Sequence, residues 1–336
     1  MSGRERGWGP WTVTKLDALS KYLSGFTTAS KNRSPVTLYL DLFAGGFESH
    51  ERGTGRPIEG SPQRALAVKP ELSKLVFCEL NEERADALEA EVKLAFPGRD
   101  VKVLPGDCNE SIPRYLAELV SREEAWRWRP AFAFIDQFSA EIHWTTIQRL
   151  AGLRSESKYK TELWLYFGES FLVRGLGLTD QADQLKYMQR IDRMYGNRAW
   201  REIHEGWKNR LLTGAQRKSE LVNLMRWQLE QELGYRYTLP LQVVRDDGNP
   251  LYTMIFATDN ETGDTIMRSV LTGAAAQMDE RSRGYKLRAQ LAKKEAQGVV
   301  GFEALDEQLT SAHVKDPGKK LLTLAPPAQP WTYPTD

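Results

Sequence analysis

The fold of this chain follows from one stretch, Thr37-Leu38-Tyr39-Leu40-Asp41-Leu42-Phe43-Ala44-Gly45-Gly46. Its apolar run is too short for a typical helix, and it ends in two glycines. Buried parallel strands have this form where they deliver the chain to a ligand at their carboxyl ends. Burying the Asp41 carboxyl costs free energy unless it has a partner, and glycine lets a backbone approach a ligand closely. The stretch therefore predicts a strand–turn corner that binds a cofactor.

The composition is that of an ordinary globular protein, with 336 residues, 41% of them apolar and 27% charged, and a net charge of +1. This net charge excludes a strongly basic nucleic-acid protein, so any nucleic-acid site is a local patch. The two cysteines, Cys78 and Cys108, are too few for a zinc cluster, and we expect no metal site. Few cysteines and no secretory signal predict a reducing, cytoplasmic setting. No apolar run reaches the roughly 18 residues of a membrane span.

Short apolar runs recur along the first half of the chain and alternate with helical patterns. We expect strands at 37–44, 74–80, 101–104, 131–135 and 162–167, and helices between them at 82–95, 111–121 and 145–153. This alternation is typical of a parallel sheet that is covered by helices on both faces.

Two segments near the first strand carry more detailed expectations. Residues 12–25 are expected to form a helix with Leu16 on its apolar face and Lys15 on its solvent face. Residues 45–60 contain five glycines and are expected to form a long loop. Ser61 is then expected to cap a helix whose first residue is Pro62.

The second half of the chain begins with an inserted helical segment at 180–233. Strands return at 235–244 and 251–258, and the Asp247-Gly248 pair between them is a strong hairpin signal. A helix is expected at 263–297, and the proline-rich tail is expected to be extended or disordered. The expected fold is α/β, a Rossmann-like class I methyltransferase sheet of about seven strands, the last two a β-hairpin, with a helical insertion.

The chain is expected to divide into five parts. They are an N-terminal arm and helix (1–35), a Rossmann-like cofactor-binding core (36–175), a helical insertion (176–234), a closing β-hairpin with return to the core (235–270), and a C-terminal helix and extended tail (271–336).

A site for S-adenosylmethionine needs four groups at the carboxyl ends of adjacent strands, and this chain has a candidate for each. A glycine turn admits the methionine part, Glu79 accepts the ribose hydroxyls, Asp107 meets the adenine amine, and Asp136 lies beside the methyl group. The expected cofactor-binding residues are Asp41, Phe43, Gly45, Gly46, Glu79 and Asp107. Each acid taken alone is equally consistent with a helix cap or a solvated turn.

Several stretches resemble the three-Cys-motif partner protein family. They are 39–45, 60–66, 77–81, 106–109, 134–138, 251–260 and 263–267. The resemblance covers roughly residues 12–270. It implies a methyltransferase-like protein that binds S-adenosylmethionine and acts with a radical iron–sulfur protein. The three cysteines belong to that partner and are absent from this chain.

Two residues depart from the family's pattern. Phe47 replaces the last glycine of the first turn, where it either crowds the cofactor or shifts the loop, and Gln137 replaces a proline after Asp136. In amino-methyltransferases of nucleic acids, an Asp/Asn-Pro-Pro-aromatic turn clamps an exocyclic amine and stacks on the base. By this resemblance Asp136 and Phe138 are expected to be catalytic. His143 is a candidate general base, although a lone histidine also serves structural roles.

A nucleic-acid contact is expected where cations alternate with aromatic residues. The candidates are Trp126, Arg127, Trp128, Arg129 and, after the fifth strand, Arg174. Tryptophan just before a strand also packs under the edge of a sheet, so this alternative stays open.

Three hypotheses on function remain. The first is an S-adenosylmethionine-dependent methyltransferase-like enzyme that acts on or binds DNA or RNA with the iron–sulfur partner. The second is a non-catalytic binding or scaffold module on the same fold, which Phe47 and Gln137 favour. The third is an enzyme that uses the site for different chemistry.

Overall fold

Seven strands form one sheet in the order β5-β4-β1-β6-β7-β9-β8. They are β1 (Leu38–Asp41), β4 (Lys74–Glu79), β5 (Val101–Pro105), β6 (Ala131–Ile135), β7 (Glu162–Phe167), β8 (Tyr237–Val244) and β9 (Pro250–Thr258). The first five are parallel, while β9 runs antiparallel to both β7 and β8. This confirms the expected class I methyltransferase sheet with its closing hairpin. The computed structural model describes residues 9–31, 33–51, 55–296 and 321–334.

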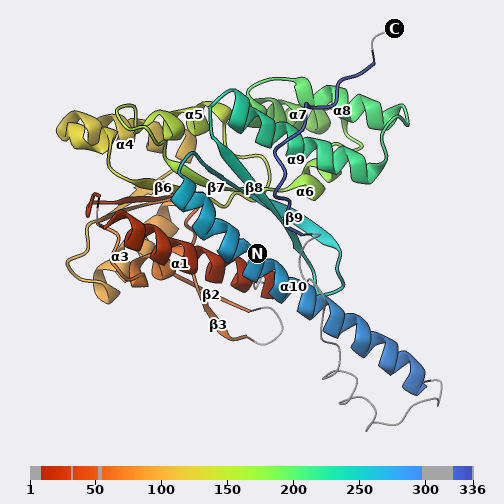
Figure 1. Ribbon diagram of the computed structural model, residues 1–336, viewed down its shortest axis with the longest axis horizontal. Helices are drawn as coiled ribbons and strands as arrows, with labels where there is room; N and C mark the ends of the chain where they lie inside the picture. The colour runs from red at the N-terminus through yellow and green to blue at the C-terminus, as the bar shows by residue number, and fades with distance from the viewer. Residues whose placement is uncertain (1–8, 32, 52–54, 297–320, 335–336) are drawn as a thin grey trace.

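Helices cover both faces of the sheet, as the apolar strands require. One face packs against α1 (Pro10–Ser30), α2 (Ser61–Ala67), α3 (Glu82–Ala95) and α10 (Glu261–Ala296). The other packs against α4 (Cys108–Arg122), α5 (Trp144–Gly152), α7 (Gln181–Tyr195), α8 (Ala199–Lys208) and α9 (Gly214–Gln231). The remaining helices of the described residues are the short η1 (Glu124–Arg127) and α6 (Glu169–Gly175). Figure 1 shows the two layers, with α1 and α10 side by side.

The loop expected at 45–60 is in fact a small antiparallel hairpin of β2 (Glu48–His50) and β3 (Pro57–Glu59). The expectation that Ser61 caps the next helix was also wrong, because the N-cap is Gly60. A Cβ on Gly60 would lie 2.4 Å from the carbonyl oxygen of Gly46 and 2.8 Å from that of Phe47. Two backbone segments touch there, and only glycine fits.

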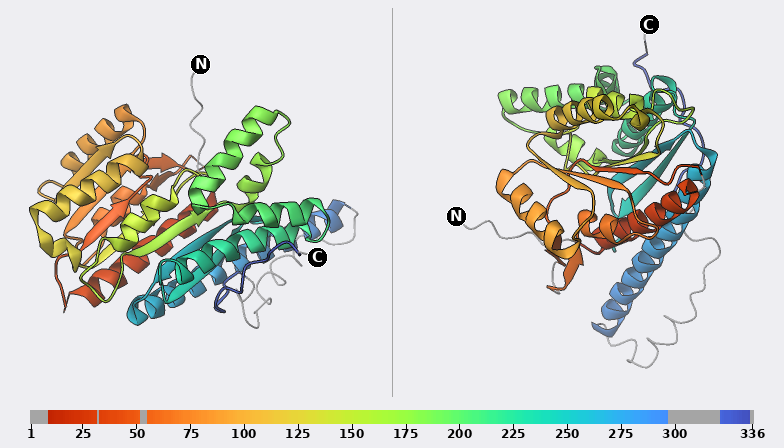
Figure 2. Two further views of the ribbon diagram at one scale, coloured as in Figure 1. Left: turned by 90° about the horizontal axis from the view of Figure 1, so that it is seen from above. Right: turned by 90° about the vertical axis from the view of Figure 1, so that its left-hand side faces the viewer.

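The C-terminal segment 321–334 is extended, and it packs along the helical layer, as both views of Figure 2 indicate. The Asn223 side chain donates to the carbonyl of Ala328 and accepts from its N–H. A Cβ on Gly206 of α8 would lie 2.3 Å from the ring of Trp331, so this ring lies directly on the helix. No helix within the described residues is long and apolar enough to cross a membrane.

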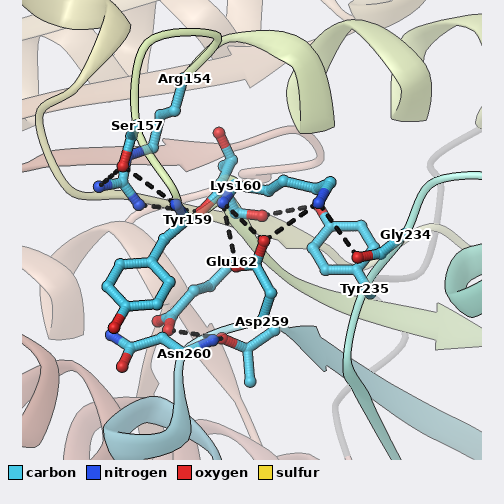
Figure 3. A network of polar contacts seen from close by, with 11 residues as sticks. Arg154, Ser157, Tyr159, Lys160, Glu162, Gly234, Tyr235, Asp259 and Asn260 are labelled. Carbon is cyan, nitrogen blue, oxygen red and sulfur yellow. Dashed lines mark hydrogen bonds and ion pairs between the residues drawn. The ribbon is translucent and has the colours of Figure 1, made fainter.

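A buried polar network ties the sheet to its helices at the amino end of β7 (Figure 3). The Glu162 carboxylate accepts hydrogen bonds from the Tyr22 hydroxyl of α1 (2.5 Å) and the Thr258 hydroxyl of β9 (2.8 Å). Burial raises the pKa of Glu162 to about 7. Beside it, Lys160 bridges the Asp259 carboxylate and the carbonyl of Gly234, at 3.1 Å to each.

Two glycines of α10 give a matched test of this network. Gly263→Ala places a Cβ 2.2 Å from Oε1 of Glu162, whereas Gly273→Ala meets nothing within 4 Å. We expect Gly263→Ala to lower the free energy of unfolding by about 1–3 kcal/mol, because buried hydrogen bonds are disrupted. Gly273→Ala should raise it by about 0.5–1 kcal/mol through helix propensity. Urea denaturation measures both, and equal effects would contradict the network's role.

Candidate functional site

Four strand ends meet along the carboxyl edge of the sheet. Because β5, β4, β1 and β6 are parallel neighbours, the corners at Asp107, Glu79, Gly45 and Asp136 follow one another in that order. Backbone hydrogen bonds join adjacent corners, from Gly106 N–H to the carbonyl of Glu79 and from Ala44 N–H to that of Cys78, both 2.9 Å. The topology therefore brings the four expected corners together.

Glu79 is the central side chain of this edge. Its Oε2 accepts from the N–H of Gly45 at 3.1 Å and its Oε1 from the N–H of Asn81 at 3.0 Å. Gly45 and Gly106 on either side have φ values of 65° and 97°, a conformation that favours glycine. A Cβ on either glycine would point into open space. The two turns thus frame a cradle beside a carboxylate, and these residues fit a nucleoside-containing cofactor.

Asp41 is the last residue of β1, just before the turn at Gly45, and it is fully buried. Its carboxyl accepts from the N–H of Phe43 (3.3 Å), the Tyr39 hydroxyl (3.2 Å) and the side chain of Ser61. Burial raises the pKa of Asp41 to about 7. The structure therefore places Asp41 as an anchor between the turn and α2. Phe43 is half-buried and packs against the core on the α4 side.

Phe47 does not enter the cradle. Its side chain is 8% exposed and packs in the core, with its ring 6.2 Å from that of Phe96. Because Phe47 packs in the core where the chain enters the β2–β3 hairpin, it does not crowd the cradle, and one argument for a non-catalytic module is weakened.

Asp136 forms an ion pair with Lys15 of α1. The expectation that Lys15 faces solvent was wrong, since its side chain is 8% exposed and Asp136 is 23% exposed. The Lys15 ammonium also lies 6.0 Å from the ring centroid of Phe134 and 5.8 Å from that of Tyr252. A long lysine stem can cover apolar surface while its charge meets a carboxylate. The helical pattern gave no signal for this, because the partner lies 121 residues further along the chain.

Gln137 holds the turn after Asp136 from inside. Its Oε1 accepts from the N–H groups of Glu141 (2.8 Å) and Ile142 (2.9 Å), and its Nε2 donates to the carbonyl of Tyr166 (3.1 Å). The side chain is 1% exposed. Hydrogen bonds thus supply the rigidity that proline would give by its fixed φ.

Phe138 and Arg174 lie together at this corner. Phe138 is 67% exposed, and its ring centroid is 5.1 Å from that of Phe171. The Arg174 guanidinium lies over the Phe171 ring, 4.5 Å from its centroid. Sequence reasoning missed Phe171, because it lies in a short helix with no motif around it. The three side chains form an exposed stacking platform.

His143 lies beside the Asp107 corner. Its backbone N–H donates to Oδ1 of Asn109 at 2.8 Å, and the Asn109 side chain donates to the carbonyl of Glu141. Desolvation and then the charge of Arg193 lower the pKa of His143, while Asp107 opposes them. A lowered pKa favours the neutral form that a general base requires, so the suggested role of His143 remains a prediction.

The candidates Trp126, Arg127, Trp128 and Arg129 precede β6 and therefore lie at the opposite, amino edge of the sheet. Trp126 is 4% exposed and packs in the core, with the Arg129 guanidinium 4.5 Å from its ring centroid. Arg129 also pairs with Glu123. These residues cannot share one site with Asp136, and for Trp126 the structure fits the alternative of packing under the sheet edge.

No family model and no curated protein matches the sequence, so the resemblance to the three-Cys-motif partner family remains a prediction. Similar solved structures include a protein from Legionella pneumophila (12% identity, TM-score 0.43, covering 78% of this chain and 90% of that chain). An O-methyltransferase from Bacillus cereus in complex with SAH is 12% identical, with a TM-score of 0.40, and the match covers 76% of this chain and 83% of that chain. A plantazolicin methyltransferase in complex with SAH is 8% identical, with a TM-score of 0.32, and the match covers 74% of this chain and 86% of that chain. These values are too low to carry an inference about function.

The Lys15–Asp136 pair predicts an asymmetry between its two partners. Asp136→Asn leaves a buried ammonium without a counter-charge, which typically costs about 3–5 kcal/mol. Lys15→Met leaves a partly exposed carboxylate that water can solvate, and we expect a loss of about 1 kcal/mol. The double variant should be more stable than Asp136→Asn alone. A double-mutant cycle in urea measures these differences, and additive losses would show that the pair does not couple.

Proposed function

We propose that this chain is an S-adenosylmethionine-dependent methyltransferase whose acceptor is an amino group on a nucleic-acid base. The observation that carries the proposal is the cradle of Gly45 and Gly106 around Glu79, next to the Asp136 corner. When bound, the cofactor supplies an electrophilic methyl group. Glu79 would accept hydrogen bonds from the ribose hydroxyls. The glycine turn would leave room for the methionine part of the cofactor beside the backbone, and Asp107 with Asn109 would face the adenine.

The Asp136 corner suits an amine, because the Lys15 ammonium already binds there. An acceptor amine would donate hydrogen bonds to the Asp136 carboxylate beside Lys15, which keeps its counter-charge. The platform of Phe138, Phe171 and Arg174 supports stacking of a base beside it, since aromatic faces and guanidinium groups both bind bases.

The proposal of a partner rests on the sequence resemblance. By that resemblance the chain would act with a radical iron–sulfur protein that carries three cysteines, on DNA or RNA. A second candidate function is a binding module without catalysis, and the ion pair that occupies Asp136 favours it.

Calorimetry with S-adenosylmethionine tests the cofactor site. We expect saturable binding by the wild type and at least about tenfold weaker binding by Glu79→Gln, because charge-assisted hydrogen bonds to the ribose are lost. Glu83→Gln on the exposed side of α3 is the matched control and should bind as the wild type does. Absence of binding by the wild type would contradict the proposal and leave the binding module.

The acceptor side is tested by the affinity for single-stranded oligonucleotides, measured by fluorescence anisotropy at fixed salt. Phe138→Ala should weaken binding about tenfold, as expected when one base loses a stacking partner. Trp128→Ala is the control, since Trp128 is 47% exposed at the opposite edge. Weaker binding by Trp128→Ala together with unchanged binding by Phe138→Ala would instead indicate a nucleic-acid site at the amino edge of the sheet.

A further inference from the structure

Helix α7 lies along the carboxyl edge of the sheet, beside the acceptor corner. The Tyr187 hydroxyl forms a hydrogen bond with the Ser139 hydroxyl at 2.7 Å and donates to the carbonyl of Phe171 at 3.1 Å. Just after the helix, a Cβ on Gly196 would lie 2.5 Å from the ring of Trp144, the first residue of α5. The helix therefore extends from the stacking platform to the start of α5.

Two arginines of α7 lie on the side of the helix next to these contacts. Arg190 follows Tyr187 by three residues and Arg193 follows Arg190 by three, and residues at this spacing are neighbours on a helix surface. Burial raises the pKa of Tyr187, and the charges of Arg190 and Arg174 are among the causes that oppose the rise. Desolvation and then the charge of Arg193 lower the pKa of His143. The guanidinium groups are therefore close to residues that border the acceptor corner.

The fold does not neutralise the positive charge along this side of α7. Three exposed arginines form no ion pair with an acid among the described residues, and we call them the arginine row: Arg174, Arg190 and Arg193. By contrast, Lys186 of the same helix pairs with Asp183 at 3.5 Å. Two acids beside the row already bind backbone N–H groups, since Glu141 accepts from the N–H two residues earlier at 2.6 Å and Asp107 caps α4. An exposed surplus of unpaired cations attracts anions.

We propose that the arginine row binds the phosphates of a single-stranded nucleic acid and directs one of its bases to Phe138. This inference rests on the acceptor class of the proposed function and adds the surface that holds the strand. Proteins that bind single strands combine cations along the backbone with aromatic side chains on which bases stack. Both features meet at Arg174, whose guanidinium belongs to the row and lies over the Phe171 ring.

The exposed platform favours a single strand over other anions. An acidic peptide would pair with the arginines but offers no planar base to the ring of Phe138, which is 67% exposed. A base inside a duplex is paired and stacked on its neighbours, so it reaches such a ring only after unpairing. A strand that is single at this point satisfies both the cations and the ring.

Fluorescence anisotropy with labelled single-stranded DNA and RNA oligonucleotides, at several salt concentrations, measures the contribution of the row. The test variant carries Arg190→Gln and Arg193→Gln together and keeps Arg174 on its ring. We expect binding at least about tenfold weaker near physiological salt, and a plot of log affinity against log salt that is shallower by about 1.4, because each phosphate contact with a single strand contributes about 0.7. Phe138→Ala should weaken binding without changing this slope, since stacking releases no counterions.

Three controls separate charge from position. Arg149→Gln removes an exposed arginine from the last turn of α5 and should bind as the wild type does. Arg190→Lys with Arg193→Lys keeps both charges and should retain the wild-type slope, because counterion release depends on charge. Melting temperatures of these arginine variants should match that of the wild type, since the substituted side chains are exposed.

Four results would overturn the proposal. They are no binding of either oligonucleotide by the wild type at low salt, an unchanged affinity and slope in the glutamine variant, binding of the duplex form that equals or exceeds binding of the single strand, and competition by polyglutamate as strong as by unlabelled oligonucleotide. The last result would indicate a surface for acidic polypeptides. A loss in the DNA arm, the RNA arm or both supports the row and identifies the strand that it binds.

Calorimetry of the wild type with S-adenosylmethionine reports separately on the proposed methyl transfer. If the cofactor does not bind but the row still sets the salt slope, the proposed function fails and the row stands. If the cofactor binds and the glutamine variant behaves as the wild type does, the row fails and the cofactor site stands.

Discussion

The carboxyl edge of the sheet depends on the contact between Gly60 and the turn at Gly46 and Phe47. The N–H of Gly60 donates to the carbonyl of Phe47 at 2.7 Å, and no side chain larger than hydrogen fits at Gly60. This contact closes the β2–β3 hairpin and starts α2, whose first residue Ser61 bonds to Asp41. It thereby turns Phe47 into the core and leaves the N–H of Gly45 directed at Glu79. A single close approach of two backbones thus shapes the cradle.

The Lys15–Asp136 pair makes the acceptor corner nearly neutral in the free protein. An isolated carboxylate there would repel nucleic acid and would be costly to enclose. With Lys15 in place, the charge of the corner is balanced, and an incoming amine would donate to the same carboxylate beside the lysine. The same pair is compatible with a scaffold that binds no amine. Measuring cofactor binding distinguishes the methyltransferase from the scaffold, because only the methyltransferase needs a cofactor in the cradle.

The local pattern of the sequence predicts much of the fold. Strands β6 and β7 and helix α3 have the bounds that their apolar periodicity indicates, and the corners at Glu79, Asp107 and Asp136 follow from strand ends. What it does not predict depends on distant partners. Lys15 meets Asp136 across 121 residues, Gln137 bonds to the carbonyl of Tyr166, and Phe171 stacks on Phe138 from the next corner. Such contacts are set by the tertiary arrangement, and a short window of sequence carries no trace of them.

Three buried acids show how the fold uses carboxyl groups at the ends of its strands. Burial raises the pKa of Asp41, Glu162 and Glu169 to about 7 in each case. Asp41 and Glu162 accept hydrogen bonds from hydroxyl or backbone donors of neighbouring elements, so their burial is compensated and they join those elements. Glu169 has the same burial, and its own N–H, the charge of Lys218 and Thr253 of β9 oppose the rise of its pKa. All three acids therefore connect the end of a strand to a neighbouring element, Asp41 to α2, Glu162 to α1 and Glu169 to β9.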